Sequence, residues 1–361
     1  MSPAVAVVGC GAWGRNHVRV LHELGALAGV VEVLPALQEK IREAYPPVPV
    51  WHSLEEALPH ADGIVVATPP PSHAALASRA LAAGKGVLVE KPMTLCAREA
   101  QGLVDQARRA GRPLMVGHLL LYQPAVRELK RLLDTGAVGR LLRIHQERLN
   151  HGRVRCTENV LWSLAPHDLA VLCHLMGGAP RGVRALGAAF LQPGIHDDVH
   201  LDLAFGGGRS AHVHAAWYWP GKRRGLRVLG SEGMIAYNEA DQSLTLHRKR
   251  LKGGDPPAGL APVDEGTERV FEGAGDPLRL EDQHFLHCLA TGATPLSDGP
   301  SGVQVVRILE EADAQLNESL RPDSSEAEPR DRFAHAGSPR ALPPGAPGQG
   351  PGAPATAKET A

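Results

Sequence analysis

A glycine-rich hexapeptide near the N-terminus has the spacing of a phosphate-binding turn. Gly9-Cys10-Gly11-Ala12-Trp13-Gly14 follows the apolar run Val5 to Val8 and precedes a helical pattern. In such a turn the first glycine permits the bend, the second leaves room for a pyrophosphate, and the third lets helix and strand approach. The helix N-terminus then faces the anion. The motif predicts a dinucleotide site, with contributions from Gly9, Gly11, Ala12, Trp13, Gly14 and Asn16.

An acidic residue follows the second apolar run at the place of a ribose ligand. Glu32 comes after Gly14 at close to the offset of about 20 residues expected for an acid that binds the ribose 2′-hydroxyl. A carboxylate there repels a 2′-phosphate, and Val33 offers no positive charge to receive one, although Arg42 would reach if its helix turned inward. The sequence therefore favours NAD over NADP. A turn that serves only strand-to-helix packing is the alternative.

Two more polar corners follow apolar runs further along the chain. They are Ala67-Thr68-Pro69-Pro70-Pro71-Ser72-His73 and Glu90-Lys91-Pro92. Ligands of open α/β sheets bind at the carboxyl ends of the strands. We therefore expect Thr68, Pro69, His73, Glu90 and Lys91 to line the cofactor site, with Lys91 projecting towards the reacting carbon. Without further context, a solvated surface lysine is the simpler interpretation of Lys91.

Strand and helix patterns alternate over the first third of the chain and would position these corners. Ser53 and Glu56 form a capping-box pair, Thr94 precedes a helical pattern, and Gly84 and Gly111 lie where helices should end. Apolar runs without polar alternation indicate strands buried on both faces. These runs are Val5 to Val8, Leu27 to Val31, Ile64 to Ala67, Val87 to Val89 and Leu114 to Val116. Residues 1–121 are therefore predicted to form an α/β Rossmann domain with a doubly wound parallel sheet.

The pattern changes after about residue 140. Segments such as 199–203 and 211–215 alternate polar and apolar residues, which indicates antiparallel strands with one wetter face. Helices are expected near residues 166–176, 280–290 and 303–320, so residues 122–320 are predicted to form an α+β domain. We expect residues 253–266 to form a loose loop. The tail, residues 321–361, is rich in Pro, Gly and Ala and is predicted to be disordered.

Composition excludes several classes of function. The 361 residues carry 38 Lys and Arg against 39 Asp and Glu, so no single-sign field favours nucleic acid or an anionic membrane surface. The five cysteines are scattered and form no C-x-x-C pair, which argues against a disulfide framework and a thiolate zinc site. No uncharged apolar stretch approaches the roughly 20 residues of a membrane-spanning helix. These features predict a cytoplasmic protein.

In this order and spacing, the glycine turn, Ala-Thr-Pro-x-x-x-His and Glu-Lys-Pro resemble the Gfo/Idh/MocA family of NAD(P)-dependent oxidoreductases. The resemblance spans residues 1 to about 320. It implies a Rossmann domain followed by a domain with a large, mostly antiparallel open sheet, and a homodimer or homotetramer. It also implies a catalytic Lys91 and a catalytic His167. Imidazole suits removal of the hydroxyl proton, because its unperturbed pKa is about 6.5, and the ammonium group would stabilise the developing alkoxide.

One position departs from the family pattern. Many members carry an Asp one helical turn before the histidine, where this sequence has Ser163. Asp168 is then the candidate that orients His167, although adjacent residues on a helix normally point in different directions. A histidine satisfied by the backbone is the competing interpretation of His167.

Within the family, residues 116–127 and 148–155 most resemble nucleotide-sugar dehydrogenases, above all UDP-N-acetylglucosamine 3-dehydrogenases. The resemblance implies oxidation of a sugar 3-hydroxyl to a ketone, which an aminotransferase then converts to an amine. Arginine binds phosphate in bidentate fashion, so Arg148, Arg153 and Arg155 are candidates for binding a diphosphate. The alternative is that these three arginines simply lie on an exposed loop. The candidate sugar contacts are His118, Tyr122, Asn150 and Trp162, with Tyr122 equally explained as a core ring.

Three other functions compete with this one. The first is a different reaction of the same family, such as oxidation of inositol or another free sugar, or reduction of a keto sugar. The second is an NAD-binding regulator without turnover, which Ser163 makes conceivable. The third is a metal protein, suggested by His196, Asp197, Asp198, His200, His212 and His214. Polar alternation on a wet sheet face explains these residues more simply, so no metal is predicted.

Overall fold

The computed structural model describes residues 3–253, 259–273 and 275–320. The predicted disordered tail, residues 321–361, lies outside the described residues. Among the described helices, none combines the length and the apolar character that spanning a membrane requires.

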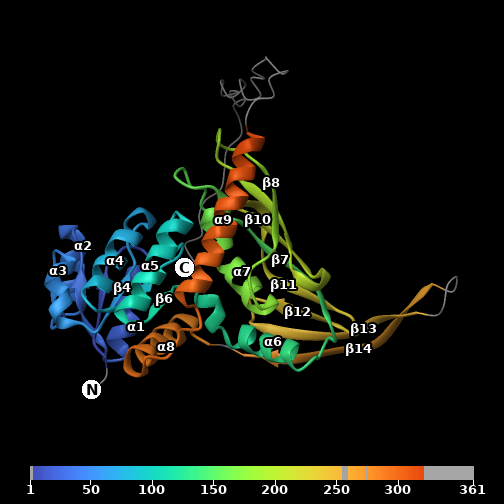
Figure 1. The fold of residues 1–361 in the computed structure, drawn as a ribbon, viewed down its shortest axis with the longest axis horizontal. Coiled ribbons are helices and arrows are strands. Elements are labelled where there is room, and N and C mark those ends of the chain that lie inside the picture. Colours follow the sequence, from blue (N-terminus) through green and yellow to red (C-terminus); the bar gives the residue numbers. More distant parts are fainter. Residues whose placement is uncertain (1–2, 254–258, 274, 321–361) are drawn as a thin grey trace, which may run out of the picture. The chain divides into compact units, whose positions relative to one another are not determined.

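A six-stranded parallel sheet organises the first part of the chain (Figure 1). Its strands are β1 (Val5–Val8), β2 (Leu27–Val31), β3 (Val50–Trp51), β4 (Gly63–Val66), β5 (Gly86–Val89) and β6 (Leu114–Val116). They lie in the order β3-β2-β1-β4-β5-β6, and all residues of β1, β4, β5 and β6 are buried. This confirms the predicted Rossmann fold. The strand order reverses between β1 and β4, and ligands of such sheets bind at that switch point.

Five helices connect these strands. They are α1 (Gly14–Glu23), α2 (Pro35–Ala44), α3 (Leu54–Ala57), α4 (His73–Ala82) and α5 (Ala97–Ala110). The Ser53 hydroxyl accepts a hydrogen bond from the Glu56 amide at 3.4 Å, and Gly111 ends α5 in the left-handed conformation, as their positions predict. Helix α5 begins after Cys96, while the Thr94 hydroxyl donates to the Cys96 carbonyl at 2.7 Å.

The glycine turn lies between β1 and α1 and shows why two of its positions lack side chains. Gly9 has a φ of 89°, a conformation that glycine adopts at little cost. A Cβ atom on Gly14 would lie 2.0 Å from the Gly9 carbonyl oxygen, whereas a Cβ atom on Gly11 would meet nothing within 4 Å. Gly14 therefore permits the close approach of helix and strand, and Gly11 leaves space beside the backbone.

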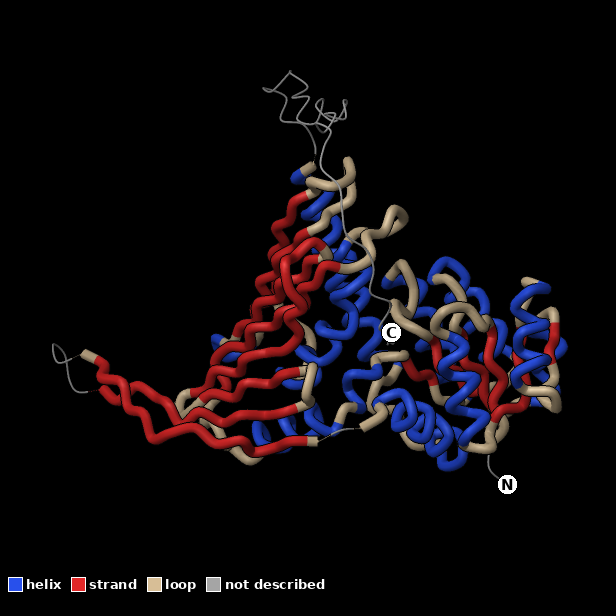
Figure 2. Tube along the Cα trace, turned by 180° about the vertical axis from the view of Figure 1, so that it is seen from behind, coloured by secondary structure: helices blue, strands red, loops and turns tan. Residues whose placement is uncertain are grey.

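A mostly antiparallel eight-stranded sheet organises the second part, in the order β14-β13-β12-β11-β7-β10-β9-β8. Its strands are β7 (Leu141–His151), β8 (Gly182–Ala188), β9 (Asp198–Ala204), β10 (Ser210–Ala216), β11 (Tyr218–Gly230), β12 (Met234–Asn238), β13 (Ser243–Gly253) and β14 (Leu260–Glu272). Among the described strands of this sheet, only β7 and β10 pair in parallel. The helices of this part are α6 (Pro124–Asp134), α7 (Val160–Met176), α8 (Pro277–Thr291) and α9 (Gly299–Ser319). Helices cover one face of the sheet, and the other face carries none of the described helices (Figure 2).

Two expectations about this part were wrong. Residues around the predicted loop 253–266 form a hairpin, in which β13 pairs with β14 from Ser243 to Gly253; residues 254–258 lie outside the described residues. Cross-strand ion pairs such as Lys249 with Asp264, at 2.9 Å, stabilise this polar hairpin. Helices α7, α8 and α9 also begin several residues earlier than expected, because Asn159, Asp276 and Asp298 cap them with side-chain oxygens.

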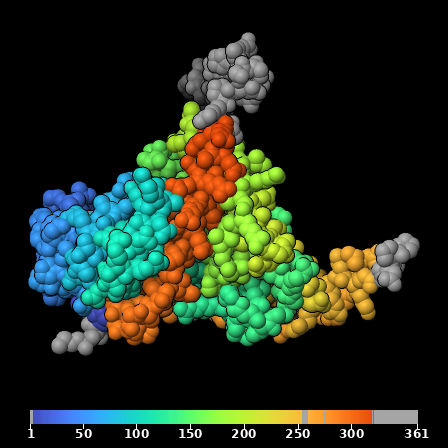
Figure 3. All heavy atoms as spheres, viewed as in Figure 1, coloured from blue at the N-terminus to red at the C-terminus, as the bar shows by residue number. Residues whose placement is uncertain are grey.

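The C-terminal helices join the two sheets. Helix α9 packs against α5, α7, β6 and β8, and Figure 3 shows it between the first part of the chain and the strands of the second. Phe285 and Leu289 of α8 lie against β4 and β5, where Gly63 and Gly86 leave room for them. One continuous hydrophobic core therefore runs from the first sheet to the second.

The glycine turn gives a prediction about stability. We expect Gly14→Ala to lower the free energy of unfolding by about 1–3 kcal/mol, because the added methyl group overlaps the Gly9 carbonyl. Gly11→Ala, the matched control, should stay within about 0.5 kcal/mol of the wild type, since its methyl group enters open space. Chemical denaturation measures both, and equal stability of the two variants would contradict the packing role of Gly14.

Candidate active site

Glu90 lies at the end of β5 and connects the glycine turn to the neighbouring corner. Its carboxylate accepts hydrogen bonds from the Trp13 indole at 2.5 Å and from the Lys91 amide at 3.0 Å. The Nε2 atom of His17 lies 3.0 Å from the same carboxylate. The carboxyl end of β5 is thus fixed to the start of α1.

His17 continues this connection to α8. Its Nδ1 atom lies 2.9 Å from the Asp282 carboxylate, and both side chains are fully buried. Burial opposes the charged imidazole, but the Asp282 and Glu90 carboxylates raise the pKa of His17 well above its usual value. Neighbouring Glu281 is also fully buried, and burial together with the charge of Glu90 raises the pKa of its carboxyl. A buried charge network therefore ties α1, β5 and α8 together.

Lys91 extends from the same corner towards α7. Its ammonium donates a hydrogen bond to the Ser163 carbonyl at 3.2 Å, and its peptide bond to Pro92 is cis. Burial lowers the pKa of Lys91, although the charge of Glu90 opposes this shift. Ser163, at the position that departs from the family pattern, thus contacts Lys91 through its backbone carbonyl. An aspartate at this position would offer the same carbonyl group.

Two histidines lie beside this lysine. The His118 and His167 rings meet edge to face, with centroids 6.1 Å apart. Both ring nitrogens of His118 and Nδ1 of His167 are buried with no hydrogen-bond partner among the described residues. Burial, followed by the charge of Lys91, lowers the pKa of His167 well below its usual value, and burial lowers the pKa of His118 to about 4. Both imidazoles are therefore neutral near pH 7, and each has a nitrogen that can accept a proton.

Asp168 does not orient His167, contrary to our expectation. The guanidinium of Arg148 donates to both Asp168 carboxylate oxygens, at 2.6 and 2.7 Å, and to Glu239 at 2.8 Å. Gln146 donates to the same Asp168 carboxylate at 2.9 Å. The predicted diphosphate contact of Arg148 is wrong for the same reason, because its charge is buried and already paired. Successive helix residues point about 100° apart, which turns Asp168 towards β7 while His167 faces Lys91.

Two further candidates have structural partners instead of free polar groups. Tyr122 is fully buried, and its hydroxyl lies 3.0 Å from the Ser297 hydroxyl, so the core-ring interpretation is correct. The two ring nitrogens of His73 lie 2.9 Å from the Pro92 carbonyl oxygen and 2.7 Å from the Thr68 carbonyl oxygen. His73 therefore joins the two polar corners to each other and has no nitrogen left for a cofactor.

The remaining cofactor candidates gather at the carboxyl end of the first sheet. The Glu32 carboxylate accepts from the amides of Cys10, Val33 and Leu34 at 2.8 to 3.0 Å. Burial opposes its charge, but these hydrogen bonds lower the pKa of Glu32 and keep it anionic. Arg42 contacts Gln38 and Glu39 instead of turning to this edge. The open space at Gly11 and the anion at Glu32 fit NAD, whose ribose has no 2′-phosphate.

The other cofactor candidates lie near this edge of the sheet. Ala12 and Trp13 are exposed, and Asn16 is half-buried in the first turn of α1. Thr68 and Pro69 lie between β4 and α4.

The remaining substrate candidates lie on β7, on the segment after it and on α7. The Oδ1 atom of Asn150 is buried with no partner among the described residues. Arg153 and Arg155 are exposed, and Arg155 lies 3.7 Å from Glu158. Arg155 is close enough to Lys91 for its charge to contribute to the lowered pKa of that lysine. Trp162 is half-buried and packs against both hydrophobic cores.

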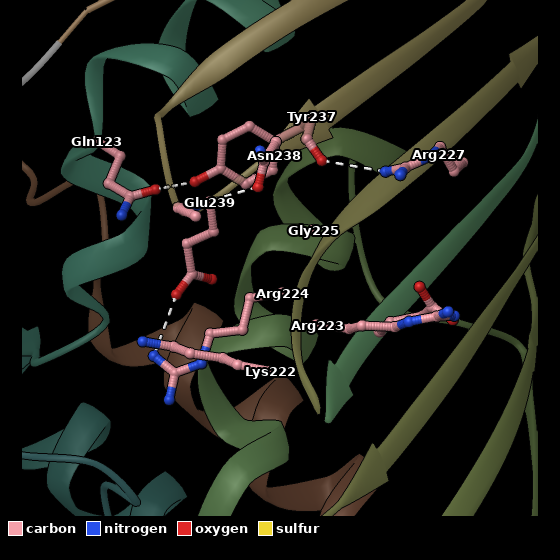
Figure 4. Close-up of a pocket in the computed structure, with 11 residues that line it drawn as sticks. Gln123, Lys222, Arg223, Arg224, Gly225, Arg227, Tyr237, Asn238 and Glu239 are labelled. Carbon is pink, nitrogen blue, oxygen red and sulfur yellow. Dashed lines mark hydrogen bonds and ion pairs between the residues drawn. The ribbon is translucent and has the colours of Figure 1, made fainter. Parts of the chain in front are cut away.

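Sequence reasoning missed a basic cavity on the second sheet. It has a volume of about 870 Å³ and is lined by Lys222, Arg223, Arg224 and Arg227 together with Glu147 and Glu239 (Figure 4). Arg224 is near enough to His167 for its charge to contribute to the lowered pKa of that histidine. The one signal in the sequence that could have pointed to this cavity is the run of three positive charges at residues 222–224.

The Arg148 network gives a prediction that separates buried from exposed arginines. We expect Arg148→Ala to lower the free energy of unfolding by about 3–5 kcal/mol, because the fully buried Asp168 then loses its counter-ion, while Glu239 keeps Arg224. Arg153→Ala, at an exposed position, should change it by less than about 0.5 kcal/mol. Urea denaturation of both variants measures the difference, and a loss below about 1 kcal/mol in Arg148→Ala would contradict a structural role for this ion pair.

Family models match both parts of the chain. The model of the oxidoreductase family with an NAD-binding Rossmann fold matches residues 4–118. The model of the Gfo/Idh/MocA C-terminal domain matches residues 126–236. The two matches cover the glycine turn, the Glu90 corner and His167.

Relatives of the chain carry names that give different substrates. The chain is 27% identical to a UDP-N-acetylglucosamine 3-dehydrogenase of Acidithiobacillus ferrooxidans, over 83% of this chain and 93% of the relative. It is 31% identical to an inositol 2-dehydrogenase of Burkholderia multivorans, over 49% of this chain and 55% of the relative.

Solved structures share the fold. The UDP-N-acetylglucosamine 3-dehydrogenase of Acidithiobacillus ferrooxidans has a TM-score of 0.78 at 24% identity, over 89% of this chain and 99% of that chain. An oxidoreductase of Magnetospirillum magnetotacticum is 30% identical, with a TM-score of 0.73, over 86% of this chain and 100% of that chain. The chain therefore belongs to the Gfo/Idh/MocA family of oxidoreductases and is an NAD-dependent enzyme that acts on CH–OH groups.

Proposed function

We propose that this enzyme oxidises a secondary hydroxyl of a nucleotide sugar, C3 of UDP-N-acetylglucosamine, with NAD as the hydride acceptor. The observation that carries the proposal is the meeting of one ammonium, Lys91, with the neutral imidazoles of His167 and His118. Lys91 and His118 lie at the carboxyl ends of β5 and β6, where the cofactor of a Rossmann fold binds, and His167 faces them from α7.

Each group has a separate task in the proposed reaction. Bound NAD supplies the acceptor for the hydride that leaves the carbinol carbon. His167 accepts the hydroxyl proton, because burial keeps its imidazole neutral at the pH at which it works. Lys91 donates a hydrogen bond to the same oxygen and stabilises its developing negative charge. The O–H and C–H bonds break as the C=O bond forms, so the proton resides on His167 and the product is a ketone.

His118 and Asn150 are proposed to hold the sugar. Each has a buried polar atom without a partner among the described residues, and such atoms are costly unless a ligand satisfies them. Sugar hydroxyls supply both donors and acceptors, so they can pair with imidazole nitrogens and with an amide oxygen. Trp162 would pack against the sugar ring.

The basic cavity supports a substrate with a diphosphate. Lys222 and Arg223 are exposed at its edge, and Arg224 reaches towards His167. An inositol ring has no charge for these groups to bind, whereas a nucleoside diphosphate does. Arg153 and Arg155 are proposed to contribute from the segment after β7. We propose that an aminotransferase consumes the ketone product. We also propose that the helix-free face of the second sheet joins copies of the chain into a homo-oligomer.

A free-sugar or inositol dehydrogenase is the second candidate. It is favoured by the inositol 2-dehydrogenase relatives, which reach 31% identity over about half of the chain. A regulator without turnover has no such observation in its favour.

The first prediction of this proposal concerns pH. Lys91 must be protonated, so kcat/KM should fall as the pH rises through its pKa, which burial places below the usual 10.5. His167 must be neutral, so activity should be lost only as the pH falls through its lowered pKa, well below the usual 6.5. A pH profile of kcat/KM measures both limbs. An acid limb at or above 6.5 would contradict the assignment of His167.

Substitutions of Lys91 and His167 test the same two roles. Lys91→Met and His167→Gln should each lower kcat by about 10²- to 10⁴-fold, while NAD affinity changes little. Lys40→Met, on the exposed face of α2, should keep wild-type kcat. Retention of turnover within tenfold in Lys91→Met would contradict its proposed role.

The second prediction concerns the substrate. Enzyme mixed with NAD and UDP-N-acetylglucosamine should produce NADH, whereas myo-inositol should not. The double substitution Lys222→Ala and Arg223→Ala should raise KM for the nucleotide sugar about tenfold or more, with kcat changed little, because it removes binding common to the ground and transition states. The matched control, Arg248→Ala with Lys249→Ala on the exposed hairpin, should leave KM unchanged. Turnover of inositol alone would contradict the nucleotide-sugar assignment.

A further inference from the structure

Helices leave one face of the second sheet open (Figure 2). A group of histidines and aspartates from three adjacent strands lies on this face. Strand alternation places them there, because Leu201 and Val213 between them are buried beneath the helices on the opposite face. The catalytic candidates, on α7 and at the ends of β5 and β6, lie on the helix-covered side. The group comprises His145 of β7, Asp198, His200 and Asp202 of β9, and His212 and His214 of β10.

Three of these side chains converge on one point. The Oδ1 atom of Asp198 lies 2.9 Å from Nε2 of His214 and 3.3 Å from Nε2 of His200. Nitrogen or oxygen ligands about 2.0–2.1 Å from a tetrahedral zinc ion lie roughly 3.3 Å from one another. The register explains the convergence, since His214 pairs directly with His200 across the antiparallel strands and Asp198 shares the face of His200. The three ligand atoms lie within 4.8 Å of one another, so one metal ion could contact all of them.

A second chain of contacts fixes the protons on His200. Nδ1 of His212 lies 3.1 Å from the Asp202 carboxylate, so this nitrogen carries a proton. The other nitrogen of a neutral His212 is then an acceptor, and it lies 3.4 Å from Nδ1 of His200. This hydrogen-bond pattern assigns the His200 proton to Nδ1, which leaves a lone pair on the Nε2 atom that faces Asp198.

This arrangement leaves two acceptors facing each other, the Nε2 atom of His200 and the Asp198 carboxylate. A cation between the two atoms relieves their repulsion. It would also lie within reach of a third ligand atom, because Nε2 of His214 lies 2.9 Å from the same Asp198 oxygen.

We propose that Asp198, His200 and His214 bind one divalent transition-metal ion, with zinc as the preferred ion. Two imidazoles and one carboxylate suit zinc, whereas Mg²⁺ and Ca²⁺ favour oxygen ligands. His212 and Asp202 form the outer shell that holds the His200 tautomer, an arrangement common to metal-binding histidines. The side chain of His200 is 44% exposed in the single chain, so the fourth coordination position opens onto the sheet face that is also proposed to join copies of the chain.

This proposal revises the sequence-based interpretation of the histidine-rich segment. His196 is fully buried and is not part of the group. Asp197 accepts a hydrogen bond from the Trp217 indole at 2.7 Å. Neither takes part. The bound ion would connect β9 to β10 on the face opposite the proposed catalytic groups, which makes the site independent of the substrate assignment.

The test uses the full chain without an affinity tag, stripped with a chelator and titrated with Zn²⁺ by calorimetry and with Co²⁺ by visible absorption. Wild-type protein should bind one equivalent of either ion, and Co²⁺ should give the absorption of a tetrahedral site. Asp198→Asn, His200→Gln and His214→Gln should each weaken binding by at least 100-fold. His212→Gln, in the outer shell, should weaken it by about 10- to 100-fold.

His287→Gln is the matched control, because it removes an exposed histidine of α8 outside the group, and it should bind like the wild type. Zn²⁺ should also raise the Tm of the wild type but not that of His200→Gln, which keeps the test valid if a variant is less stable. Failure of the wild type to bind one equivalent, or binding that the three ligand variants leave unchanged, would overturn the proposal. Loss of Co²⁺ binding in His118→Gln alone would also overturn it, by placing the ion in the catalytic cavity.

Discussion

A single buried carboxylate, that of Glu90, determines how the rest of the candidate active site is arranged. It contacts the Trp13 indole, the imidazole of His17 and the amide of Lys91, and so joins the glycine turn to the carboxyl end of β5. A buried charge is stable only with partners in good geometry. His17 satisfies this requirement by lying between Glu90 and Asp282 of α8. Helix α8 therefore takes part in holding the glycine turn and the end of β5 in place.

This constraint gives neighbouring groups opposite protonation states. Lys91 follows Glu90 directly and keeps its charge beside a carboxylate and the Ser163 carbonyl. His167 and His118 are buried next to that positive charge and stay neutral. An ammonium beside neutral imidazoles is the division that alcohol oxidation requires, with one group stabilising negative charge and another accepting a proton.

The parts of this picture that local chemistry determines could be predicted from the sequence. The alternation of apolar runs and helical patterns predicted the Rossmann sheet. The glycine turn, Glu32 and Lys91 could be selected as candidates because each directly follows a strand, and a strand end can be recognised from a few neighbouring residues. The partners of Arg148, Asp168 and Tyr122 could not be predicted, because each depends on which side chain faces it across strands or helices distant in sequence. Helix starts were misjudged where Asn159, Asp276 and Asp298 act as caps. The His17 network and the basic cavity likewise arise only when distant segments meet.

The proposed chemistry depends on Lys91 and His167 facing the same reacting carbon. A crystal structure of the enzyme with bound NAD tests this most directly. We predict that C4 of the nicotinamide lies in the cavity that contains the Lys91 ammonium and the His167 imidazole, with space for a sugar carbon between them. A nicotinamide that lies outside this cavity, or with the two side chains on opposite sides of its ring, would contradict the proposed mechanism.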